Sequence, residues 1–114
     1  MSGSYRILEY SEGDRSPFAE WFDELDSVTA ARVDRYVRRL EAGNFGAAKV
    51  LRDGVFELRL DFGPGYRVYF GRDGGAIIVL LAGGDKRRQS VDIATAVERW
   101  RRYKLMKKTH GTNT

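Results

Sequence analysis

Residues 54–89 decide the fold: GVFELRLDFGPGYRVYFGRDGGAIIVLLAGGDKRRQ. Apolar and polar side chains alternate over residues 55–61, and they alternate again over residues 66–70. A period of two is typical of a strand with one buried face. The intervening Gly63-Pro64-Gly65 predicts a tight turn, because proline fixes φ and glycine accepts positive φ. These residues therefore predict an antiparallel hairpin.

The alternation also restricts how the two strands of this hairpin pair. Directly opposed residues of an antiparallel pair point to the same face, and a slip of one residue would bury the charges. Arg59 is therefore expected to oppose Arg67 or Tyr69, and not Val68. Either register places Glu57, Arg59, Arg67 and Tyr69 on one polar patch, with the core on the other face of the sheet. Two adjacent arginines repel each other unless an anion lies between them, which suggests an anionic ligand.

A third strand and a basic loop complete this stretch. Asp73-Gly74-Gly75 predicts a second turn, and residues 76–82 are apolar without alternation, as expected for a central strand covered on both faces. Three cations, Lys86, Arg87 and Arg88, follow this strand after two glycines that let the backbone approach a ligand.

The other elements are predicted from caps and periodicity. Residues 5–10 predict a first strand, and Ser16-Pro17 begins a helix with an apolar stripe to residue 25. A second helix is expected to reach residue 42, residues 45–53 form a connection, and a closing helix follows Ser90. The order β-α-α-β-β-β-α predicts an α+β fold with a mostly antiparallel sheet and the helices packed on one face. The place of the first strand in the sheet does not follow from the sequence.

Length and composition limit the possible classes of protein. A chain of 114 residues is expected to form one domain spanning residues 1–114, with residues 1–4 and 109–114 flexible. The chain has no cysteine, one histidine, no apolar run long enough for a membrane span and no signal-peptide pattern, so a cytoplasmic protein without metal or cofactor is expected. The net charge of +4 arises entirely from residues 86–114, which favours an anionic partner such as nucleic acid and a solvated basic helix about equally.

The cation cluster is the strongest candidate for chemistry. A hydrolase triad cannot be built, because His110 is the only histidine, and no Walker A or dinucleotide motif is present. Guanidinium groups suit an RNA phosphate whose charge grows in the transition state, while a carboxylate, or a tyrosine or lysine with a lowered pKa, would accept the 2′-OH proton. The candidate catalytic residues are therefore Glu57, Arg59, Arg67, Tyr69 and Lys86. The alternative is that Glu57 pairs with Arg59 and that the other charges are ordinary surface residues.

Several blocks taken together resemble the RelE/ParE toxin superfamily, in its addiction-module killer (HigB-like or Gp49-like) branch. The blocks are Gly54-x-x-Glu57-Leu58-Arg59, Gly65-Tyr66-Arg67-Val68-Tyr69-Phe70, Leu80-Leu81-x-Gly83-Gly84-Asp85-Lys86 and Gln89-x-x-Asp92-Ile93-x-x-Ala96. The likeness covers about residues 5–104. It implies a compact RelE-like fold and the toxin of a type II toxin-antitoxin module. Such a toxin cleaves mRNA on the translating ribosome and is neutralised by a cognate antitoxin, here expected to be of the helix-turn-helix type.

The resemblance also assigns roles to particular residues. In ribonuclease members the working cations match Arg59, Arg67 and the Lys86-Arg87 pair. The residues expected to bind RNA are Arg87, Arg88, Arg99, Arg102, Lys104 and Lys107. This chain has Glu57 where RelE has a lysine, which makes Glu57 a candidate base rather than a phosphate ligand. Two alternatives are a ParE-like DNA gyrase inhibitor, which shares the fold and needs no catalytic patch, and a non-catalytic nucleic-acid-binding relative.

Overall fold

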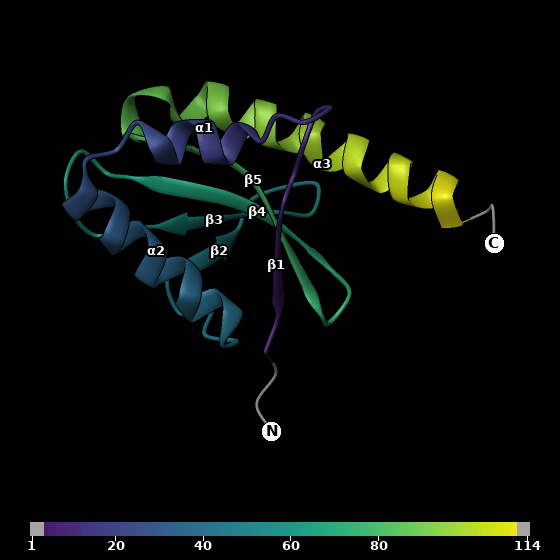
Figure 1. Cartoon of the computed structure of the whole chain (residues 1–114), viewed down its shortest axis with the longest axis horizontal. Helices are drawn as coiled ribbons and strands as arrows, with labels where there is room; N and C mark the ends of the chain where they lie inside the picture. The colour runs from purple at the N-terminus through teal and green to yellow at the C-terminus, as the bar shows by residue number, and fades with distance from the viewer. Residues whose placement is uncertain (1–3, 112–114) are drawn as a thin grey trace.

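The computed structural model describes residues 4–111, with only the backbone for residues 109–111 (Figure 1). The elements in order are β1 (Arg6–Glu9), α1 (Pro17–Asp23), α2 (Ser27–Glu41), β2 (Ala48–Val50), β3 (Val55–Arg59), β4 (Arg67–Asp73), β5 (Ile77–Gly84), the 3-10 turn η1 (Lys86–Arg88) and α3 (Gln89–Gly111). The expected flexibility of the ends concerns mainly residues 1–3 and 112–114, which lie outside the described residues. Helix α3 continues through residues 109–111, where a frayed tail was expected.

The five strands form one sheet in the order β1-β5-β4-β3-β2. Strand β1 runs parallel to β5, and the other neighbours are antiparallel, so the expected mostly antiparallel α+β fold is confirmed. The first strand pairs with the last one at an edge of the sheet. Strand β2 lies within residues 45–53, which were expected to be only a connection.

The predicted β3–β4 hairpin is present in one of its two expected registers. Arg59 opposes Arg67 and Glu57 opposes Tyr69. The next pair, β4 and β5, places Arg67 opposite Gly84. The end of β3, the beginning of β4 and the end of β5 therefore meet at one end of the sheet.

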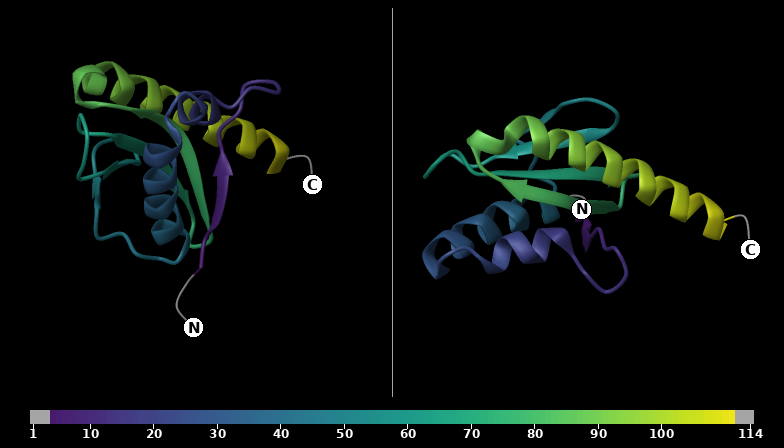
Figure 2. Two further views of the ribbon diagram at one scale, coloured as in Figure 1. Left: turned by 60° about the vertical axis from the view of Figure 1, so that its left-hand side comes forward. Right: turned by 90° about the horizontal axis from the view of Figure 1, so that it is seen from above.

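The helices lie on both faces of the sheet, and the expectation that they pack on one face is wrong. Helices α1 and α2 cover one face, and α3 crosses the other, as the view from above in Figure 2 shows. The first core contains Phe18 and Val37 from these two helices, and the second contains Ala96 and Trp100 from α3. Strand β5 contributes to both cores, which is the reason that its apolar run does not alternate.

The first helix begins where its sequence signal predicts, and a side-chain cap also begins the second helix. The Ser16 hydroxyl accepts a hydrogen bond from the Ala19 amide at 3.1 Å, and Asp26 accepts one from the Thr29 amide at 2.9 Å. These side chains satisfy amides that the first turn of each helix leaves without a partner. No helix within residues 4–111 combines the length and the apolar character that crossing a membrane requires.

Helix α1 approaches β5 closely because residue 83 has no side chain. A methyl group added to Gly83 would lie 2.1 Å from the indole ring of Trp21. We expect Gly83→Ala to lower the free energy of unfolding by about 1–3 kcal/mol, since the helix must shift to relieve the clash. Urea denaturation would measure this loss. Gly75→Ala is the matched control, because a methyl group there would meet no atom within 4 Å, and an equal loss in both variants would contradict the explanation.

Candidate active site

A buried ion pair lies near the end of the sheet at which the turn joins β3 to β4. Arg67 Nε donates to Glu57 Oε2 at 2.9 Å, and Arg67 Nη1 donates to the carbonyl oxygen of Gly65 at 2.7 Å. The same Glu57 oxygen accepts a hydrogen bond of 2.7 Å from Nε2 of Gln89, which is the first residue of α3. Glu57 is 0% exposed and Arg67 is 5% exposed, because α3 covers this face of the sheet. Glu57 therefore pairs with Arg67. The alternative drawn from the sequence, in which Glu57 pairs with Arg59, is wrong.

Two residues of this network were not singled out from the sequence. Lys49 lies on β2, and its Nζ is 3.7 Å from Glu57 Oε1. Its strand has only three residues, too few for alternation to be recognised. Gln89 belongs to one of the blocks quoted for the family resemblance, but its contact with Glu57 depends on how α3 crosses the sheet. Spacing along the chain does not contain that information.

Exposed cations surround the buried pair. Arg59 lies beside Arg67 across the hairpin, is exposed and makes no ion pair among the described residues. Lys86 is exposed as well, and its amide donates to the carbonyl oxygen of Pro64 at 3.4 Å. This bond holds the start of η1 beside the hairpin turn. Backbone pairing thus brings the positions of Arg59, Arg67 and Lys86 to one end of the sheet, and their role in catalysis stays a prediction.

Arg87 and Arg88 extend the cluster along the 3-10 turn. The Arg87 amide donates to Asp85 Oδ1 at 2.9 Å, and its side chain is 88% exposed with a long ion pair of 3.7 Å to Asp85. Arg88 is exposed and forms no ion pair in the described part of the chain. The cluster therefore presents exposed cations around one buried cation, Arg67, which hydrogen bonds hold in place.

Tyr69 lies beneath this surface and not on it. Its side chain is 0% exposed, and its hydroxyl has no hydrogen-bond partner within residues 4–108. Burial raises the pKa of the Tyr69 hydroxyl above its ordinary value, and the negative charges of Glu57 and Asp92 raise it further. The direction is opposite to the lowered pKa that was expected of a tyrosine base.

We expect Tyr69→Phe to affect bacterial growth as the parent protein does, because the hydroxyl is buried and holds its proton. The variant should also be as stable as the parent, or slightly more stable, since it removes a buried hydroxyl without a partner. A growth assay and a thermal melt would measure both effects. Complete loss of activity from a folded variant would return Tyr69 to the catalytic candidates.

Asp92 is a further acid near the cluster that the sequence did not single out for chemistry. Its Oδ2 lies so close to Gly84 that a methyl group there would approach it to 2.0 Å, and this oxygen has no hydrogen-bond partner among the described residues. Burial raises the pKa of the Asp92 carboxyl. A carboxyl group with a raised pKa beside a cation cluster is a candidate for proton transfer.

The cations expected to bind RNA on α3 do not join this cluster. Arg99 donates to the carbonyl oxygen of Leu81 at 2.7 Å, and Arg102 pairs with Glu98 and Glu12. Lys104 and Lys107 line a pocket near the far end of the helix, roughly 25 Å from Gln89 at 1.5 Å per residue. The helix therefore separates these side chains into different surfaces.

The acidic side chains within residues 4–108 form no group of three that would hold a metal ion.

Comparison with known proteins identifies the family. A sequence model of the family described as phage-derived protein Gp49-like matches residues 20–104. The chain belongs to this family. The resemblance to the Gp49-like branch of the RelE/ParE superfamily, drawn from the sequence, is thereby confirmed.

A relative and a solved structure extend this comparison. The Gp49-like chain is 45% identical over 80 residues to an uncharacterized protein of Haemophilus influenzae, covering 69% of this chain and 81% of the relative. Its fold matches that of the Escherichia coli toxin RelE, solved in the free state as a double arginine-to-alanine mutant. The TM-score is 0.62 at 19% identity, and the match covers 84% of this chain and 97% of RelE. At this identity the likeness concerns the fold.

Proposed function

We propose that this Gp49-like protein is the toxin of a type II toxin-antitoxin module and cleaves mRNA on the translating ribosome. The observation that carries the proposal is the cluster of Arg59, Arg67 and Lys86, in which two exposed cations flank a third that is held in place. Glu57 already neutralises Arg67, so the exposed Arg59 and Lys86, which have no ion pair among the described residues, are the charges that can bind an anion. An RNA phosphate suits two such cations. The family and the RelE-like fold support the assignment as a toxin.

The proposed reaction is an attack of the RNA 2′-oxygen on the neighbouring phosphorus. The bond from phosphorus to the 5′-oxygen breaks, and the products are a 2′,3′-cyclic phosphate and a 5′-hydroxyl. Arg59 and Lys86, whose side chains are exposed, would bind the phosphate oxygens and stabilise the charge that develops in the transition state. Arg67 is nearly inaccessible, so it would act on that charge only through space, from beneath the surface. A base accepts the 2′-OH proton and an acid protonates the leaving oxygen. Asp92 is our candidate for one of these two proton transfers, because its pKa is raised.

Glu57 has a different role in this proposal. Its burial and its bonds to Arg67 and Gln89 make it a positioning residue that fixes the guanidinium group. A fixed guanidinium group reorganises little when charge develops on the phosphate, which is the basis of electrostatic catalysis.

The partners follow from this assignment. Ribosome-bound mRNA would be the substrate, the site of action would be the cytoplasm, and an antitoxin, which we expect to be of the helix-turn-helix type, would neutralise the protein.

Primer extension on an mRNA, with purified protein and with or without translating ribosomes, tests the proposal. New 5′ ends inside codons only when ribosomes are present are the expected result. Cuts on free RNA would support a ribonuclease that does not require the ribosome. A protein that stops growth and damages DNA without cutting RNA would instead be a ParE-like gyrase inhibitor.

A further inference from the structure

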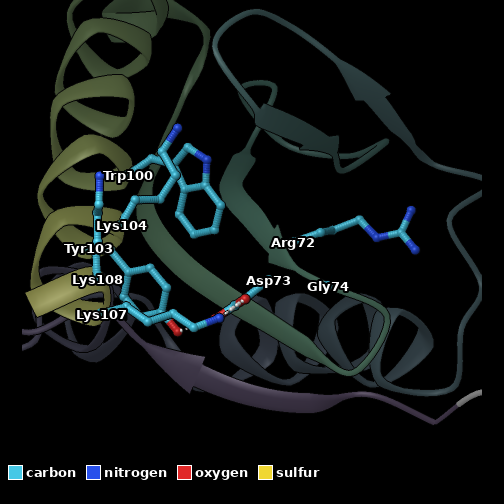
Figure 3. Close-up of a pocket in the computed structure, with 8 residues that line it drawn as sticks. All are labelled: Arg72, Asp73, Gly74, Trp100, Tyr103, Lys104, Lys107 and Lys108. Carbon is cyan, nitrogen blue, oxygen red and sulfur yellow. Dashed lines mark hydrogen bonds and ion pairs between the residues drawn. The ribbon is translucent and has the colours of Figure 1, made fainter. Parts of the chain in front are cut away.

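A pocket of about 560 Å³ lies between the turn that joins β4 to β5 and the later turns of α3 (Figure 3). Its lining residues are Arg72, Asp73, Gly74, Trp100, Tyr103, Lys104, Lys107 and Lys108. The helix residues follow the spacing i, i+3, i+4, i+7, i+8, so they share one face of α3. This pocket is at the opposite end of the helix from the cation cluster described above.

Hydrogen bonds and packing hold the pocket walls in shape. Tyr103 donates its hydroxyl to Asp73 Oδ2 at 2.8 Å, and Lys107 binds the other oxygen of the same carboxylate, as the dashed line in Figure 3 shows. The rings of Trp100 and Tyr103 stack with their centroids 5.3 Å apart. Trp100 also packs against Gly71, where a methyl group would lie 2.5 Å from the indole ring. Trp100 and Tyr103 therefore form a rigid aromatic wall of the pocket without any ligand.

The rim of the pocket is positively charged. Lys104 and Lys108 are exposed, and neither forms an ion pair among the described residues. The one carboxylate in the lining, Asp73, is already neutralised by Lys107, and this contact together with the Tyr103 hydroxyl lowers the pKa of Asp73. Arg72 points away from the helix in Figure 3, where its guanidinium donates to the Tyr5 hydroxyl. Lys104 Nζ lies 5.8 Å from the centroid of the Trp100 ring, but neither lysine has a carboxylate partner among the described residues, so both remain available for an anionic partner.

We propose that this pocket binds an acidic protein segment that inserts an apolar side chain between the lysines. The carboxylates of the segment would pair with Lys104 and Lys108, and the apolar side chain would rest against Tyr103, which is only half-buried. Amphipathic segments bind grooves in this way, with apolar anchors inside and charges at the rim.

Single-stranded RNA fits the pocket less well. Proteins that bind single-stranded nucleic acids offer open aromatic faces on which bases stack. Trp100 is only 5% exposed, and part of its ring lies against Gly71, so it has almost no face to offer. The proposal adds a protein-binding surface to the proposed function and does not depend on ribonuclease activity.

Fluorescence anisotropy with a short labelled polyglutamate peptide that carries two leucines one helical turn apart tests this inference. We expect saturable binding to the full chain at physiological ionic strength. Two altered peptides, one with serine for leucine and one with glutamine for glutamate, should each bind roughly tenfold more weakly or worse. The same loss is expected for the parent peptide with the variant Lys104→Glu/Lys108→Glu.

The matched control is Arg35→Glu/Arg101→Glu, which changes the net charge equally at exposed residues outside the pocket. This control should bind the peptide as the parent does. An equal loss in both double variants would show non-specific attraction and overturn the proposal. Absence of peptide binding would also overturn it, as would an oligouridylate that binds through Lys104 and Lys108 in place of the peptide.

Discussion

Replacing Arg67 with alanine is expected to lower the free energy of unfolding by about 3–5 kcal/mol, because the Glu57 carboxylate would remain buried without its partner. Arg67 is nearly inaccessible, and its guanidinium group also binds the carbonyl oxygen of Gly65. From the sequence, the same substitution would remove a surface charge and leave the fold intact. Urea denaturation followed by circular dichroism would measure the loss.

Two further variants isolate the buried pair. Glu57→Gln/Arg67→Ala should be more stable than Arg67→Ala alone, because no charge is then left buried. Arg59→Ala removes the exposed neighbour and should change the free energy of unfolding by no more than about 0.5 kcal/mol. If Arg67→Ala were as harmless to stability as Arg59→Ala, the buried pair would not hold this end of the sheet together.

Replacing Lys86 or Arg59 with alanine is expected to reduce mRNA cleavage by roughly 10²–10³-fold each while leaving the protein folded. Both side chains are exposed and neither makes an ion pair among the described residues, so little stability depends on them. Each would contribute a charged hydrogen bond to a phosphate whose charge increases in the transition state. Primer extension on ribosome-bound mRNA, together with a thermal melt, would separate lost activity from lost folding.

Arg35→Ala is a suitable control for these two variants. It removes one positive charge from the exposed face of α2, on a helix that packs against the opposite face of the sheet. Cleavage by this variant should match that of the parent. If Lys86→Ala and Arg59→Ala stayed folded and fully active, the cluster would not be the phosphate site.

Much of the fold was predictable because the hairpin has a strict pattern. Alternation over residues 55–61 and 66–70 left two registers, and the structure has the one in which Arg59 opposes Arg67. The covering of both faces of the sheet was missed for a physical reason. Taken separately, a glutamate and an arginine are expected to face solvent. As an ion pair, Glu57 and Arg67 neutralise each other and can be buried under α3. The apolar run of β5 already indicated two covered faces.

The candidate site was predictable where the chain itself brings residues together. Arg59 and Arg67 are neighbours through a short turn, and Lys86 follows the strand that pairs with β4. The environment of Tyr69 was not predictable, since it depends on the path of α3. The basic residues of α3 were grouped by sequence, although a straight helix of 23 residues spreads them over different surfaces.

The place of β1 in the sheet has a consequence for how the chain folds during synthesis. Within residues 4–111 its one strand partner is β5, which is the last of these strands to be made, and Arg6 pairs with Ile77. The strands β2 to β5 have neighbours close in sequence and can pair early, whereas the parallel β1–β5 contact must close a long loop. Strand β1 therefore cannot pair until β5, and with it nearly all of the sheet, has been translated. The protein completes its sheet late, and a nascent chain that lacks β5 holds Arg59 and Arg67 without the Lys86 that completes the cluster.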